Sequence, residues 1–194
     1  MPRPTLKKQR REQILDAFEQ CVARYGLAGA TLERVSEEAD LARPLIRHNV
    51  GNRDELVAAF MDRFFERSTE VMTSLREHLP ARDKAQALIN WLFQPGASDP
   101  RLVLVSSALI MAAAYEPALA RQMRSWMDEF TGLFEDALKA DFPRTDEQQL
   151  HMVATGLCGI YLNYESMTPL GPVSDLRTSS HDAALALLGT LGSS

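Results

Sequence analysis

Side chains suited to DNA contact are concentrated between residues 31 and 53 of this 194-residue chain. Arginine can donate two parallel hydrogen bonds to the edge of a guanine base, and arginine, histidine and asparagine can all donate to phosphate oxygens. Such donors recur at short spacing here: Arg43, Arg47, His48, Asn49 and Arg53. The spacing predicts that the first four lie on the outer surface of one short helix.

Two short helices separated by a tight turn are expected to position these donors. Thr31 is a suitable N-cap, and Val35 and Ala39 follow at helical spacing for a buried face. Asp40 falls in the turn, because aspartate tolerates a left-handed backbone. Pro44 suits the first turn of the second helix. A short helix packed across another in this way fits a DNA major groove, so we predict a helix-turn-helix over about residues 31–50.

Residues 8–57 resemble the DNA-binding domain of the TetR family of transcriptional regulators. The matching positions are Thr31, Val35, Ala39, Leu41, Ile46 and Leu56, with Arg53 in place of the usual lysine. The chain departs from the family pattern at Ser36, Asp40 and Ala42, where alanine, glycine and serine are usual. It also departs at Arg47, Asn49 and Val50, where tyrosine, histidine and an aromatic residue are usual. The resemblance implies that Arg43, Pro44 and Leu45 read bases. It also implies that phosphates are contacted by Thr31, Arg47, His48, Asn49 and Arg53.

Composition points to an ordinary soluble protein that acts in the cytoplasm. Hydrophobic residues make up 45% of the chain and charged residues 24%. The longest apolar segment, residues 102–115, is too short to span a bilayer, and no signal peptide is apparent. Cys21 and Cys158 provide no disulfide framework and are expected to be buried thiols. We therefore expect no membrane association.

The net charge of −5 does not argue against DNA binding, because the basic residues are unevenly distributed. Phosphate attraction acts over about a Debye length, so a local basic segment can bind DNA on an acidic protein. A basic arm is predicted before and at the start of the first helix, from Arg3, Lys7, Lys8, Arg10 and Arg11. A solubilising tail is the alternative interpretation of this arm.

Turn signals divide the chain into about nine helices, which predicts an all-α fold. A three-helix DNA-binding domain is expected over residues 1–53, and an effector-binding and dimerisation domain over residues 54–194. Gly26 is expected to end the first helix. Beyond the helix-turn-helix, the predicted helices cover residues 54–78, 82–93, 101–114, 117–140, 146–167 and 175–191.

The resemblance implies that the second domain binds a small-molecule effector and forms a homodimer. The helices near 146–167 and 175–191 are apolar on more than one face, which favours a four-helix bundle between two copies. Composition favours an apolar or aromatic effector. Any lining residue could equally be ordinary core; the candidates are Trp91, Met111, Tyr115, Trp126, Met127, Phe130, Tyr161 and Tyr164.

The sequence contains no motif of an enzyme, and no cofactor is expected. Glu147, His151 and Cys158 share a helix face, but packing explains them better than a metal site. We therefore predict a TetR-like regulator, a repressor of a palindromic operator that an apolar or aromatic effector relieves. The first alternative is a helical protein–protein or ligand-binding module whose helix-turn-helix no longer binds DNA specifically. The second is a helical hydrolase or binding protein.

Overall fold

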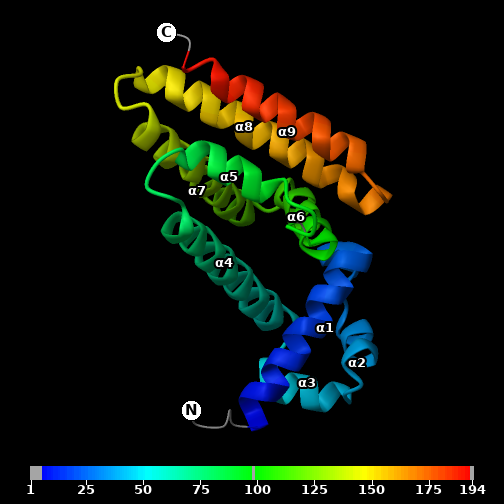
Figure 1. Ribbon diagram of the computed structural model, residues 1–194. Coiled ribbons are helices and arrows are strands. Elements are labelled where there is room, and N and C mark those ends of the chain that lie inside the picture. Colours follow the sequence, from blue (N-terminus) through cyan, green and yellow to red (C-terminus); the bar gives the residue numbers. More distant parts are fainter. Residues whose placement is uncertain (1–5, 98, 193–194) are drawn as a thin grey trace. The chain divides into compact units, whose positions relative to one another are not determined.

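The computed structural model describes residues 6–97 and 99–192, so Arg3 of the predicted basic arm lies outside the described residues. Over these ranges the chain is helical and contains no strand, which confirms the all-α prediction (Figure 1). The helices are α1 (Leu6–Gly29), α2 (Leu32–Ala39), α3 (Arg43–Val50), α4 (Arg53–His78), α5 (Lys84–Leu92), α6 (Pro100–Ala113), α7 (Pro117–Asp141), α8 (Glu147–Met167) and α9 (Ser174–Gly189), with a 3-10 turn at Thr168–Leu170.

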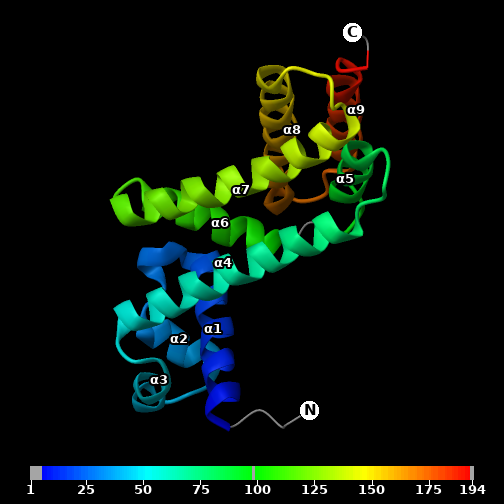
Figure 2. The same cartoon turned by 90° about the vertical axis from the view of Figure 1, so that its left-hand side faces the viewer.

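The first compact unit comprises Met1–Thr69 and Leu104–Ala120. It holds α1, α2, α3, the first part of α4, most of α6 and the start of α7, which Figures 1 and 2 label. Its core is made of buried apolar side chains. Phe18 of α1 meets Phe60 of α4 edge to face, with 5.1 Å between the ring centroids. This contact joins the long helix α4 to the same core as the helix-turn-helix.

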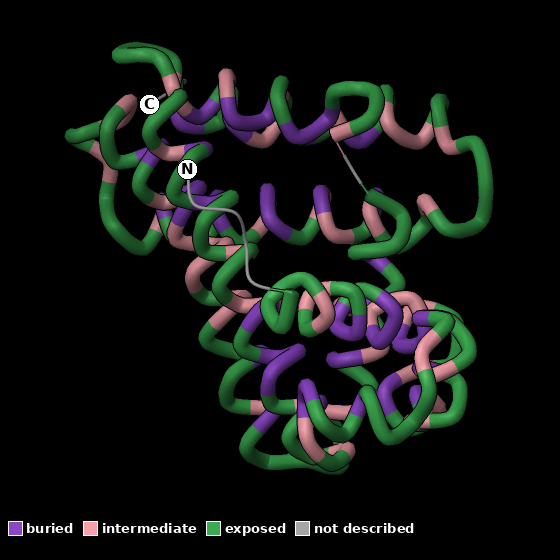
Figure 3. The backbone as a smooth tube through the Cα atoms, turned by 90° about the horizontal axis from the view of Figure 1, so that it is seen from below, coloured by how far each residue is buried: buried purple, intermediate pink, exposed green. Residues whose placement is uncertain are grey.

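The second unit comprises Glu70–Val103 and Arg121–Ser194. Helices α8 and α9 lie side by side, and α5 packs against α9 (Figures 1 and 2). Buried residues recur along the helices between exposed ones, as in amphipathic helices (Figure 3). The core includes Leu88, Ile89, Leu133, Leu138 and Leu157. The predicted division of the chain at residues 53 and 54 remains a prediction.

Local backbone geometry follows the turn signals of the sequence. Gly26 has φ 70° and ψ 170°, so it interrupts the helical backbone of α1 where the first helix was expected to end. Asp40, which ends α2, has φ 50° and ψ 48°. Both residues have a positive φ, and each lies where the sequence predicts that the chain leaves a helix.

Cys21 and Cys158 are both buried and both carry free thiols. Burial raises the pKa of each thiol above its ordinary value, because the thiolate would lose its hydration. Among the described residues, no helix is long and apolar enough to cross a membrane.

A buried guanidinium links α4 to α1 within the first unit. The side chain of Arg63 is 8% exposed, and its nitrogens lie 2.6 Å from Asp16 and 2.9 Å from Glu19. A third carboxylate, that of Glu12, lies 3.5 Å away. Arg67 reaches two of these acids at longer range, 3.9 Å from Glu12 and 3.6 Å from Glu19, and is half exposed. Arg63 therefore partly compensates three carboxylates of α1 that would otherwise repel one another.

We expect Arg63→Ala to lower the free energy of unfolding by about 2–4 kcal/mol, because it leaves three neighbouring carboxylates without their buried cation. Arg67→Ala is the matched control and should cost less than about 1 kcal/mol, since its ion pairs are solvated. Urea unfolding of both variants measures the difference. Equal losses would show that burial does not distinguish these two arginines.

Candidate nucleic-acid interface

Short polar contacts cap the start of α2 and fix the turn between α2 and α3. The Thr31 hydroxyl accepts a hydrogen bond from the Arg34 backbone N–H at 3.3 Å and caps α2. At the other end of α2, the Ser36 hydroxyl donates to the Leu41 carbonyl at 2.6 Å, across Asp40. The Leu41 N–H donates to the Ser36 carbonyl at 3.1 Å. These bonds fix the direction in which α3 leaves the turn.

Helix α3 turns one face inward and the other outward. Ile46 and Val50 are buried in the unit that also buries Val35 and Ala39 of α2. The exposed positions of α3 are Arg43, Pro44, Leu45, Arg47 and His48. A face with two arginines and a histidine beside two apolar residues can donate to base edges and phosphates and can contact thymine methyl groups.

Pro44 lies in the first turn of α3, as predicted, and Ala42 at the N-cap has no side-chain acceptor to cap the helix.

The Arg43 guanidinium donates through Nη2 to Oε1 of Glu33, in the first turn of α2. Sequence reasoning missed this pairing, because the two residues are ten positions apart. The available signal was an acid and a base in the first turns of the two helices.

Asn49 does not lie on the outer surface of α3, and that expectation is corrected. Its side chain is 9% exposed, and its Nδ2 donates to the Leu45 carbonyl at 2.8 Å. The physical reason is helical spacing, since Ile46, Asn49 and Val50 share one face. As it lies, Asn49 packs inside the unit rather than facing a phosphate.

Arg53 is half-buried, and its Nη2 donates to the Leu27 carbonyl at 2.8 Å. It therefore anchors the start of α4 to the end of α1. Arg34, which sequence reasoning did not select, donates to the Gly29 carbonyl at 2.7 Å, and its guanidinium lies 4.2 Å from the Tyr25 ring centroid. Both cations are held by contacts within the protein.

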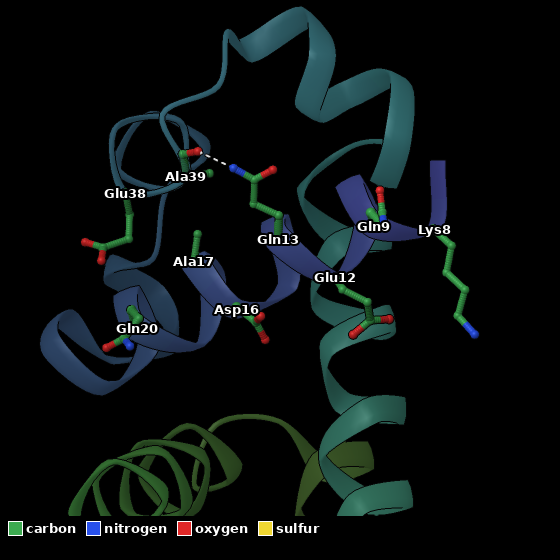
Figure 4. Close-up of a pocket in the computed structure, with 9 residues that line it drawn as sticks. All are labelled: Lys8, Gln9, Glu12, Gln13, Asp16, Ala17, Gln20, Glu38 and Ala39. Atoms are coloured by element: carbon green, nitrogen blue, oxygen red, sulfur yellow. Dashed lines mark hydrogen bonds between the residues drawn. The ribbon is translucent and has the colours of Figure 1, made fainter. Parts of the chain in front are cut away.

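An open groove of about 580 Å³ runs along α1 beside the end of α2. Figure 4 shows its polar lining and the hydrogen bond, 2.9 Å long, that Gln13 donates to the Ala39 carbonyl. Three of its lining residues are acidic, Glu12, Asp16 and Glu38, against one lysine, Lys8. Such an acidic surface is unsuited to binding phosphate, so the groove differs in charge from the basic face of α3.

Comparison with known proteins identifies the architecture. A curated protein from Stenotrophomonas maltophilia, named HTH-type transcriptional regulator BetI, is 26% identical over 127 residues, 64% of this chain and 65% of that protein. A protein of the same name from Burkholderia ambifaria is 26% identical over 153 residues, 78% of this chain and 69% of that protein. The chain thus spans just under two thirds of the first of these relatives. No family model matches the chain.

Solved structures agree in fold. A protein from Pseudomonas aeruginosa PAO1 superposes with a TM-score of 0.77 at 21% identity, covering 96% of this chain and 92% of that one. A TetR transcription regulator from Haloarcula marismortui gives a TM-score of 0.71 at 17% identity, covering 93% and 96% of the two chains. The chain therefore has the fold of solved TetR-family regulators. The curated relatives of the chain are named as transcriptional regulators rather than as enzymes.

The structure divides the eight residues predicted to line an effector pocket between its two compact units. Met111 and Tyr115 belong to the first unit and are 67% and 87% exposed, while the other six belong to the second. Trp91 is also exposed, and Trp126 and Met127 are half-buried. Residue type alone therefore did not predict burial.

Three of the eight do come together in an aromatic cluster of the second unit. Phe130 and Tyr161 have ring centroids 5.6 Å apart, and Tyr161 and Tyr164 lie 6.4 Å apart. Phe93, which follows α5 and was not predicted, contacts both tyrosines at 5.7 Å and 5.4 Å. Burial raises the pKa of Tyr161 well above its usual range, and the neighbouring Glu165 carboxylate raises it further. This cluster is apolar and keeps Tyr161 neutral.

Glu147, His151 and Cys158, which were considered as metal ligands, have different surroundings in the structure. His151 Nδ1 lies 2.6 Å from Oε1 of Glu135 on α7, whereas Cys158 is buried and Glu147 is exposed. Within the described ranges, no three His, Cys, Asp or Glu side chains are grouped as metal ligands would be.

Asp40 provides a direct test of the turn geometry. Asp40→Ala should lower the free energy of unfolding by about 1 kcal/mol, because alanine tolerates a left-handed backbone less well than aspartate does. Asp40→Gly should be neutral or stabilising by up to about 1 kcal/mol. Thermal unfolding measures both, with Glu37→Ala on the same helix as control. Equal stability of the alanine and glycine variants would contradict the assigned backbone conformation.

Proposed function

We propose that the chain is a homodimeric transcriptional regulator that binds a palindromic operator in double-stranded DNA and represses transcription until a small apolar or aromatic effector binds. The observation that carries the proposal is the exposed basic face of α3, on a helix whose opposite face is buried. Relatives named as HTH-type transcriptional regulators support it. As a DNA-binding regulator, the protein would act in the cytoplasm.

In this proposal, the first turn of α3 reads bases. Arg43 would bind guanine through two N–H groups, and Pro44 and Leu45 would contact thymine methyl groups. Phosphates would be contacted by Arg47 and His48, which are exposed, and by Thr31 at the N-terminus of α2. Arg53 would approach a phosphate while it stays bonded to Leu27, and Asn49 would support α3 from inside.

For the homodimer, we propose the surface formed by α8 and α9. A shallow groove of about 490 Å³ lies there, lined by residues that are mostly small: Gly156, Gly159, Ile160, Asn163, Ser179, Ser180 and Ala183. Gly156 serves packing inside the protomer, since a Cβ there would come within 2.7 Å of Leu187. A Cβ at Gly159 would meet nothing within 4 Å. Gly159 would therefore allow a helix of a second copy to approach closely.

For the effector, we propose the aromatic cluster of Phe93, Phe130, Tyr161 and Tyr164 as the receptive region of the second unit. Its rings offer offset and edge contacts to a flat apolar molecule. The effector would relieve repression if it preferred a conformation that cannot place both recognition helices on the operator.

The first alternative is a helical protein–protein or ligand-binding module whose helix-turn-helix no longer binds DNA specifically. The family-atypical Arg47, Asn49 and Val50 favour it. Selection of sequences from a random duplex library with purified protein, followed by salt titration of the enriched sequence, separates the two. A palindromic consensus with a steep salt dependence supports the regulator. Enrichment of no sequence at low salt supports the module.

Arg43→Ala should flatten base preference, with a loss of about 1–3 kcal/mol on the enriched sequence and a smaller loss on random duplex. Arg47→Ala should weaken binding to both duplexes alike and lower the salt slope by about one, because a phosphate contact carries no sequence information. Fluorescence anisotropy at several salt concentrations measures both. If Arg43→Ala weakened both duplexes equally, Arg43 would not be a base-reading residue.

Gly159→Leu should raise the dimer dissociation constant at least about tenfold, because the added side chain occupies space that the partner helix requires. Gly132→Leu is the matched control, since a Cβ at this α7 glycine also meets nothing within 4 Å. Analytical ultracentrifugation measures the dimer, and circular dichroism checks that each variant folds. A dimer unaffected by Gly159→Leu would place the interface elsewhere.

A further inference from the structure

Arg43, the residue proposed to read guanine, is already held by a carboxylate of its own chain. Its Nη2 donates to Oε1 of Glu33, which connects the first turn of α3 to the first turn of α2. Both side chains are exposed, Arg43 by 55% and Glu33 by 64%. The pair therefore lies at the surface that the proposed function turns toward DNA.

The pair changes what Arg43 can offer to nucleic acid. A guanidinium carries five N–H donors, so a bond from Nη2 to Glu33 leaves donors for a second acceptor. The carboxylate also cancels the positive charge that would attract Arg43 to any phosphate, and it repels phosphates itself. A guanine edge differs from a phosphate here, because it offers two fixed neutral acceptors rather than a charge.

We infer that Glu33 is a specificity-determining positioning residue, which orients the Arg43 guanidinium for a guanine and suppresses its binding to phosphates of unrelated sequence. This inference rests on the proposed function, because it concerns how that same DNA site discriminates. Glu33 acts through Arg43 and needs no contact with DNA of its own.

The neighbouring charges make Arg43 the natural partner of Glu33. Arg34, the next residue along α2, is held by the Gly29 carbonyl and the Tyr25 ring. Glu38, on the same helix, lies 2.9 Å from Arg24 of α1. Glu37, one helical turn after Glu33, is exposed and forms no ion pair in the described part of the chain. Glu37 therefore serves as a matched acid with the same charge and helix but without the link to α3.

The test measures affinity for two probes, the duplex enriched from a random library and a random duplex of equal length. Glu33→Gln should bind the random duplex more tightly, with a steeper salt dependence. It should lower the ratio of specific to random affinity by roughly three- to fivefold, the upper part of the range for an exposed ion pair. Glu33→Asp, which keeps the charge, should restore most of the ratio. Glu37→Gln should leave the ratio unchanged.

The same substitution is then made in an Arg43→Ala background, where Glu33→Gln should no longer change the ratio. If the effect persists in that background, or if Glu37→Gln has the same effect, Glu33 acts as a general negative charge and the inference is overturned. A wild-type protein that selects a sequence in those experiments leaves the proposed function standing. A wild-type protein that enriches no sequence overturns the proposed function, and the inference with it.

Discussion

The apolar contact between α1 and the helix-turn-helix determines most of the first unit. Ile14 and Phe18 of α1 and Val35 and Ile46 of the two shorter helices are all fully excluded from solvent. Helices of eight residues are too short to be stable alone, so α2 and α3 owe their form to this packing. Once Ile46 is buried, the opposite face of α3 must be exposed. The basic surface is thus a consequence of the core.

Electrostatics in this unit follow from how its acids are partnered. The chain is acidic overall, yet Glu12, Asp16 and Glu19 surround Arg63. These three carboxylates lie on α1, and the cation that they share, Arg63, belongs to α4. Glu33 differs, because its partner belongs to α3 itself. The same type of interaction thus joins α4 to α1 in one place and joins the exposed basic face of α3 to α2 in another.

The helix pattern was predictable because it depends on local spacing. Val35, Ala39 and Ile46 recur as a buried face requires, and Asp40 supplies the left-handed turn that they need. The inward position of Asn49 was also present in the spacing, but its polar side chain suggested the surface. The pairing of Arg43 with Glu33 was not predictable, because it depends on how two helices meet. For Met111, an apolar side chain gave no information on exposure.

The aromatic cluster of the second unit constrains any effector mechanism. Phe93 already packs against both tyrosine rings, and Phe130 packs against the ring of Tyr161. A ligand that entered would have to displace at least one ring, and the work of opening would reduce its apparent affinity. That same work makes the ligand selective for the opened state, which is the differential affinity that a switch requires. A preformed empty cavity would bind more tightly but would couple less strongly to conformation.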